Sequence, residues 1–305
     1  MRIGISVSSS YPGIAPREAA RNMVERARAA RDAGLDTLFV GDHHVTGFPY
    51  YQNNPILGRM LAEWGDRPFG ALYLLPLWHP VLLAEQVATL AAIGTGRFIM
   101  QCGLGDHRQG RAMGIDMRQR VAMFEASLQT LRTLWRGEAA DEPNFWHIER
   151  ARIAPLPPEP VEVWVGALAP AAIDRTARMA EGWLAAPNLT PLEAADGITR
   201  YRQACAEHGR IPSASAIRRD IFIGATSVEA RRVVQPYIDA GYRGMAAEAL
   251  LYGSPEEVAA QIDRFAQMGY TDVIVRNLSS RQDESIATIE RLAVVREHIA
   301  YRSTR

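Results

Sequence analysis

The feature that most constrains this chain is a repeated alternation of short apolar segments with longer segments of helical periodicity. Eight short segments have the apolar character of buried strands: 2–7, 37–41, 69–75, 98–103, 161–165, 183–186, 220–225 and 272–276. A strand that is followed each time by an amphipathic helix returns to the sheet in the same direction, so the alternation implies a parallel sheet.

Helix boundaries are marked by side chains that start or stop helices. Pro16 and Pro80 stand where a first helical turn accepts proline, and glycines such as Gly34 follow the last helical position. Ser254-Pro255-Glu256-Glu257 is a capping box with proline in the first turn. The most regular helix is predicted up to Trp135, with apolar residues three and four apart from Val121 onward.

Eight strand–helix units in 305 residues match the size of a (β/α)8 TIM barrel, which we predict over residues 1–305 as one domain with loop insertions. A doubly wound sheet would usually have fewer strands or a second domain. We expect the variable loops at 46–66, 106–117 and 138–158 to determine specificity. Working side chains of such a barrel lie at the carboxyl ends of the strands and on the loops that follow them.

Composition excludes several classes of function. All 34 basic residues are arginine and are balanced by 34 acidic residues, so no lysine serves as a Schiff-base amine or phosphate-loop residue, and nucleic acid is not an expected partner. The apolar runs are too short for a signal peptide or a membrane span. We therefore expect a cytoplasmic protein without a membrane partner.

The strongest chemical feature is Asp42-His43-His44, which directly follows the second strand. Titratable groups at that place reach a ligand in the barrel mouth. In regular strand geometry only one of two adjacent histidines faces the barrel axis, so both act only if the strand has already ended. The alternative is a hydrogen-bonded structural histidine and a capping aspartate. No H-x-H or H-E-x-x-H spacing occurs, and we expect no metal site.

Two later strand ends carry glycine-containing loops. Gly103-Leu104-Gly105-Asp106-His107-Arg108 begins like a dinucleotide fingerprint but has arginine in place of the third glycine, so a Rossmann interpretation fails. As a barrel loop it could bind an anion through Arg108, or it could be a simple turn with a solvated arginine. Gly166-Ala167-Leu168 leads into a helix whose free N–H groups could hold a phosphate.

In combination and in this order, several motifs resemble the bacterial luciferase-like monooxygenase family. They are Gly34 through His44, Leu75 through Gln86, Gly94-Thr95-Gly96-Arg97-Phe98, the helix from Arg120 to Leu134-Trp135, Gly166-Ala167 and Glu181-Gly182-Trp183. The last two each differ by one residue from the family pattern. The resemblance extends along nearly the whole chain.

This resemblance implies an oxidoreductase that binds reduced FMN or the deazaflavin coenzyme F420 at the barrel mouth, often as a homodimer. The acid-His-His stretch favours a monooxygenase that uses reduced FMN and O2 on a small organic substrate, with a separate flavin reductase. The alternative is an F420-dependent oxidoreductase that transfers a hydride. A non-catalytic flavin-binding protein is a third, minor possibility, because fold alone does not define function.

The resemblance also implies roles for individual residues. His43 matches the catalytic histidine as general acid or base, with His44 as the second candidate. The implied cofactor contacts are Asp42, Ala71, Leu72, Gln101, Gly103, Arg108, Gly166, Ala167 and Leu168. The isoalloxazine region would lie against Gln101 and Gly103, and the backbone of Ala167 and Leu168 would anchor the phosphate. A bulge with a non-prolyl cis peptide is expected at Ala71-Leu72.

Overall fold

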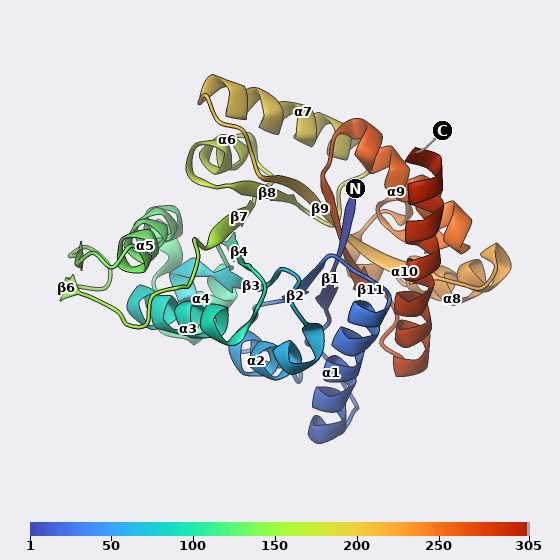
Figure 1. Ribbon diagram of the computed structural model, residues 1–305, viewed down its shortest axis with the longest axis horizontal. Helices are drawn as coiled ribbons and strands as arrows, with labels where there is room; N and C mark the ends of the chain where they lie inside the picture. The colour runs from blue at the N-terminus through green and yellow to red at the C-terminus, as the bar shows by residue number, and fades with distance from the viewer. Residues whose placement is uncertain (304–305) are drawn as a thin grey trace.

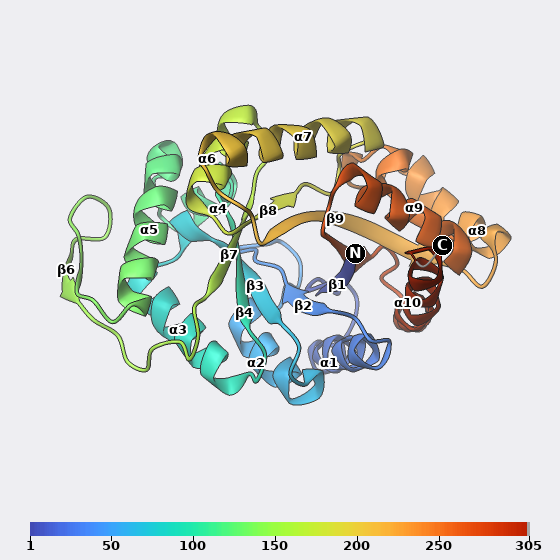
Figure 2. The same cartoon turned by 45° about the horizontal axis from the view of Figure 1, so that its top comes forward.

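Figures 1 and 2 show a closed barrel of parallel strands with helices around its outside, in a computed structural model that describes the backbone of residues 1–303 and the side chains of residues 1–300. The barrel strands, in the order in which they are hydrogen-bonded around the ring, are β1 (Arg2–Val7), β2 (Thr37–Val40), β3 (Phe69–Leu74), β4 (Phe98–Gly103), β7 (Glu162–Gly166), β8 (Gly182–Ala185), β9 (Ala214–Ile223) and β11 (Asp272–Asn277). The ring closes because β8 pairs with β9 and β11 pairs with β1. The predicted (β/α)8 barrel is confirmed.

The helices lie outside the strands, as the helical periodicity predicts (Figure 1). They are α1 (Pro16–Asp32), α2 (Asn53–Trp64), α3 (Pro80–Ile93), α4 (His107–Ala112), α5 (Arg120–Trp135), α6 (Pro170–Met179), α7 (Pro191–Glu207), α8 (Ser227–Asp239), α9 (Pro255–Met268) and α10 (Gln282–Ser303). The capping box predicted at Ser254 begins α9: its hydroxyl accepts from Glu257 N, and the Glu257 carboxylate accepts from Ser254 N at 2.9 Å. Within residues 1–303, no helix has both the length and the apolar character that a membrane span requires.

Two apolar layers result from the alternation of side chains along each strand. Alternate residues such as Leu38, Val40 and Val273 pack outward against the helices in the large core. The others point inward, where Phe39, Ile99, Trp164, Ala214, Ala216 and Ile274 fill the barrel centre. Full burial of each large apolar side chain contributes about 1.5–3 kcal/mol to stability. This inner layer fills the barrel below the carboxyl ends of the strands, which leaves those ends for polar groups.

The strand predicted at 220–225 begins earlier than expected, because β9 runs from Ala214 to Ile223. Arg218, Arg219 and Asp220 interrupt the apolar pattern in its middle and conceal it in the sequence. The two arginines point to opposite faces: Ile217 and Ile221 share the outward parity of Arg219, whereas Ala216 shares the inward parity of Arg218. Outside the barrel, Arg219 stacks on the Phe265 ring at 4.7 Å, and burial lowers its pKa to about 10.

Additional elements occur where loops were predicted. The 46–66 loop contains α2, and the 106–117 loop contains α4. The 138–158 insertion contains the hairpin β5 (Ala140–Glu142) and β6 (Ile148–Ala151), which Figure 2 shows at the edge of the molecule. A further short strand, β10 (Leu251–Gly253), pairs with the end of β9 beyond its contact with β8. Three residues are too few for the sequence pattern to reveal β10.

The cis peptide and bulge expected at Ala71-Leu72 are wrong. The cis bond within the described chain is Ala154–Pro155, and β3 pairs residue for residue with β4 from Phe69 to Leu74. A non-prolyl cis peptide costs about 3–4 kcal/mol, and the continuous ladder on this side of β3 favours ordinary extended backbone.

Candidate active site at the barrel mouth

Asp42 is the structural centre of the polar residues that follow β2. Its side chain is fully buried, and its Oδ2 accepts two hydrogen bonds at 2.8 Å, from Leu74 N and from Trp78 Nε1. Its other oxygen lies 3.1 Å from His44 Nε2. A buried carboxylate must be compensated by such donors, so Asp42 connects the end of β2 with the end of β3. The contacts of the Asp42 carboxylate are therefore with other groups of the protein.

The two adjacent histidines occupy different environments. The His44 imidazole lies between Asp42 and the Trp78 ring, which it meets edge-on with 5.4 Å between centroids. His43 is exposed at the end of β2 and meets the Tyr50 ring edge-on at 5.3 Å. β2 ends before both histidines, which is the condition under which we expected both to be able to act. Of the pair, His43 has the imidazole that a ligand can approach.

Gln109 holds the His43-His44 backbone in place. Its Oε1 accepts from His44 N at 2.7 Å and lies 3.4 Å from His43 Nδ1. Its Nε2 donates to Asp106, which also caps α4 by accepting from Gln109 N. The glycine-containing loop after β4 thus acts in this structure as a helix cap that positions the histidine loop. The sequence singled out this loop, but it did not reveal its partner.

Tyr50 forms part of the mouth that the sequence did not identify. Its hydroxyl lies over Gly41, where an added Cβ would approach it to 2.5 Å, so a larger residue at this position would displace the Tyr50 side chain. Burial raises the pKa of Tyr50 and the charge of Asp42 adds to that shift, while the charges of Arg276 and Arg218 oppose it. The loops after β1 and β2 meet at this point through the Ser10–Tyr50 bridge.

β3 and β4 present one wall of the mouth. Gln101 has the inward parity of Ile99; it is 4% exposed, and its Nε2 finds no hydrogen-bond partner among the described residues. Leu72 lies beside it in register and is partly exposed. The Leu72 carbonyl accepts from the Asn53 side chain at 2.8 Å, which fastens this wall to α2. An apolar surface beside an unsatisfied amide donor suits a flat heterocycle with ring carbonyls, as in flavins and deazaflavins.

The other residues that we predicted to contact the cofactor do not all face the barrel mouth. Ala71 points outward into the core between strands and helices, and Gly103 lies next to Leu74 at the end of β4. Arg108 donates to the Val45 carbonyl at 2.9 Å and is thus part of the histidine-loop support.

Gly166, the last residue of β7, and Leu168 in the loop that follows are exposed, whereas Ala167 is buried and its carbonyl accepts from Trp183 Nε1 at 2.9 Å. Helix α6 follows this loop, and Ala169 is the residue that precedes its first turn.

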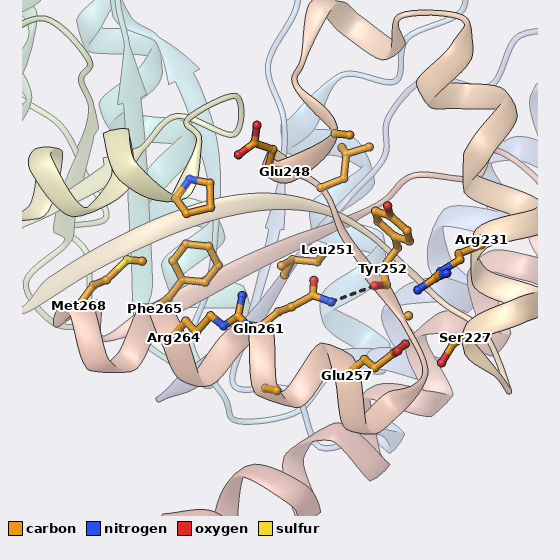
Figure 3. Close-up of a pocket in the computed structure, with 15 residues that line it drawn as sticks. Ser227, Arg231, Glu248, Leu251, Tyr252, Glu257, Gln261, Arg264, Phe265 and Met268 are labelled. Carbon is orange, nitrogen blue, oxygen red and sulfur yellow. Dashed lines mark hydrogen bonds between the residues drawn. The ribbon is translucent and has the colours of Figure 1, made fainter.

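A groove of about 630 Å³ lies outside the barrel, between α8, β10 and α9. Figure 3 shows Arg231, Glu257, Gln261 and Arg264 around it, with Gln261 donating to the Tyr252 carbonyl. Glu257 is engaged by the capping box of α9. None of the mouth residues Asp42, His43, His44 or Gln101 lines this groove, so it is separate from the candidate active site.

The chain is similar in sequence to curated proteins that are named as dehydrogenases and ketoreductases. An F420-dependent glucose-6-phosphate dehydrogenase of Nakamurella multipartita is 27% identical over 201 residues, which are 63% of this chain and 58% of the relative. A phthiodiolone/phenolphthiodiolone dimycocerosates ketoreductase of Mycobacterium bovis is 29% identical over 44% of this chain and 36% of its own length. The match thus spans a little more than half the length of the first relative and about a third of the second.

Solved structures share the fold over almost the full chain. An F420-dependent secondary alcohol dehydrogenase superposes with a TM-score of 0.81 at 16% identity, covering 98% of both chains. The oxygenating constituent of 3,6-diketocamphane monooxygenase from Pseudomonas putida, in complex with FMN, has a TM-score of 0.81 at 18% identity and covers 96% and 97%. The model of the luciferase-like monooxygenase family matches residues 1–249. The chain therefore belongs to the luciferase-like monooxygenase family.

Proposed function

We propose that the protein is a deazaflavin-dependent oxidoreductase that moves a hydride between coenzyme F420 and a small alcohol or carbonyl substrate at the barrel mouth. The observation that carries this proposal is the strand-end arrangement in which buried Asp42 contacts His44 and the adjacent His43 is exposed beside Tyr50. Oxidation of an alcohol releases one hydride from carbon and one proton from oxygen. An exposed imidazole is suited to take that proton.

Each residue of the mouth has a distinct role in this reaction. Bound F420 would supply the hydride acceptor, and Leu72 with the unsatisfied Gln101 amide would hold its ring system. His43 would accept the hydroxyl proton, or return it when a carbonyl is reduced. Gln109 fixes the histidine backbone, and the hydrogen bond from Trp78 to Asp42 fixes the loop after β3. The relatives named as F420-dependent dehydrogenases support this choice of cofactor.

The second candidate is a monooxygenase that uses reduced FMN, O2 and a separate flavin reductase on a small organic substrate. The adjacent histidines favour it, because an imidazole beside a flavin can exchange the proton that oxygen transfer requires. A homodimer is part of the proposal under either cofactor.

The proposal is tested by anaerobic titration of the purified protein with F420 and, separately, with reduced FMN, followed by a panel of alcohols and ketones. F420 binding at micromolar concentration and oxygen-independent reduction of F420 by an alcohol would support the hydride-transfer function. Binding of reduced FMN alone, with substrate-dependent oxygen consumption, would replace it with the monooxygenase. The same titration with Arg136→Gln, on the distant end of α5, serves as the control.

A further inference from the structure

Three arginines surround one carboxylate at the carboxyl ends of β9 and β11. Arg218 Nη2 lies 3.2 Å from Asp220 Oδ1, and the Nη1 atoms of Arg243 and Arg276 lie 3.0 and 3.5 Å from Asp220 Oδ2. The Tyr242 hydroxyl donates to the same Oδ2 at 2.8 Å. With three guanidinium groups and one carboxylate, the cluster has a formal charge of about +2.

Strand parity places two of these arginines inside the barrel. Ala216 and Ile274 belong to the inner apolar layer, and Arg218 and Arg276 follow them by two residues on their respective strands. The Asp220 side chain is fully buried, whereas those of Arg218 and Arg276 are each 23% exposed. The positive groups are therefore what a molecule in the mouth would meet.

The cluster retains unused hydrogen-bonding capacity. Arg218 Nε is buried and has no hydrogen-bond partner within the described part of the chain. Burial lowers the pKa of Arg218, and the charges of Arg276 and Arg243 lower it further, while Asp220 opposes both effects. A second anion would compensate this excess charge, and a guanidinium fork matches the two oxygens of a phosphate or carboxylate.

The strand order separates this cluster from the proposed cofactor wall. In the ring, β9 is four strands from β3, and β11 is four strands from β4, so each pair lies across the mouth. The loop after β1 connects the two sides, because Arg276 Nη2 donates to the Ser8 hydroxyl at 3.3 Å, and Ser10 pairs with Tyr50, whose ring contacts His43. A molecule held by the arginines could thus reach the imidazole while the cofactor occupies the opposite wall.

We propose that Arg218 and Arg276 form a specificity site for an oxyanion on the substrate, a phosphate or carboxylate group distant from the reacting carbon. The inference rests on the proposed function, since it assigns the substrate's position in the same mouth. Asp220 holds the arginine side chains, and its own negative charge limits how tightly an anion binds. The preferred substrates are therefore anionic alcohols or carbonyl compounds.

The probe is inorganic phosphate, titrated calorimetrically into the protein at constant ionic strength. The wild type is expected to bind it, and Arg276→Gln and Arg218→Gln are each expected to weaken binding at least tenfold. Arg136→Gln removes an exposed, singly paired arginine at the end of α5 and is expected to leave phosphate affinity within twofold. Because Arg218→Gln could impair folding, circular dichroism checks each variant, and Arg276→Gln carries the test alone if Arg218→Gln is unfolded. Equal phosphate affinity in wild type and a folded Arg276→Gln would overturn the proposal.

A second titration separates this inference from the proposed function. Arg276→Gln should bind F420 within twofold of wild type, and saturating F420 should leave phosphate binding intact. If F420 displaces phosphate, the arginines hold the phosphate of the cofactor and the substrate assignment is overturned. If F420 does not bind but phosphate binds through Arg276, the proposed cofactor fails while the oxyanion site stands.

Discussion

The indole N–H of Trp78 donates at 2.8 Å to the carboxylate of Asp42, which is buried 36 positions earlier in the sequence. The same carboxylate oxygen accepts from Leu74 N, and the opposite oxygen faces His44. One aspartate therefore links the end of β2, the end of β3 and a histidine. Because the buried charge depends on these donors, the loop after β3 and the histidine loop keep a fixed relative position.

Trp78→Phe is expected to lower the free energy of unfolding by about 1.5–3 kcal/mol, because it removes a hydrogen bond to a buried charged group while keeping an aromatic ring. Chemical denaturation measures the effect. Trp135→Phe is the matched control, since its indole donates to a neutral carbonyl of Ala84 at 3.2 Å and should cost about 1 kcal/mol. Equal losses in the two variants would show that the Asp42 bond has no special weight.

His43→Ala should lower turnover about a hundredfold or more and leave cofactor affinity nearly unchanged, because the imidazole would move a proton but hold no cofactor. His44→Ala is the comparison variant, and its imidazole lies between Asp42 and Trp78. Steady-state kinetics with a fluorescence titration of the cofactor separates the two effects. Normal turnover in His43→Ala would exclude that residue, and a selective loss in His44→Ala would transfer the role to it.

Gln101→Leu is expected to weaken cofactor binding about tenfold, which corresponds to roughly 1.4 kcal/mol. The variant should also keep or slightly increase the stability of the unliganded protein, since it removes a buried amide donor that has no partner in the described residues. Thermal unfolding and cofactor titration are measured on the same sample. A stability loss without any change in cofactor affinity would indicate that Gln101 is only a packing residue.

Acid should destabilise the protein through Asp220. Burial by itself would raise the pKa of this carboxyl, but Arg218, Arg276 and Arg243 outweigh that effect and hold the pKa below its ordinary value. A depressed carboxyl pKa contributes stability that is fully present above the unfolded-state value of about 3.9 and is lost as the pH falls through the folded-state value.

Asp220→Asn should therefore lower stability at pH 7 by about 3 kcal/mol, because it leaves three guanidinium groups without their carboxylate. The variant should also show a weaker decline in stability below pH 4 than the wild type. Denaturation curves between pH 3 and pH 7 check both expectations. Parallel pH profiles for the two proteins would contradict the proposed electrostatic role.

The sequence by itself determined the architecture, because hydrophobic periodicity and helix-capping residues are local signals. Pro16, Gly34 and the Ser254–Glu257 box define helix ends through contacts within a few residues. The same alternation identified the strand that leads to Asp42-His43-His44. The expectation of a flavin or deazaflavin cofactor came from the resemblance of several motifs to one family.

Only the tertiary structure decided what these side chains contact. The partners of Asp42 come from β3 and the loop after it, and two of the three arginines around Asp220 come from outside β9, so the pairing of neighbouring strands and the loops that follow them bring these groups together. Arg218 and Arg219 are neighbours in the chain, yet Arg218 shares the inward parity of Ala216 and Arg219 packs on Phe265. Strand parity directs their side chains to opposite faces of the sheet. That parity is fixed by pairing with strands that are distant in the sequence, so a local sequence pattern does not reveal it.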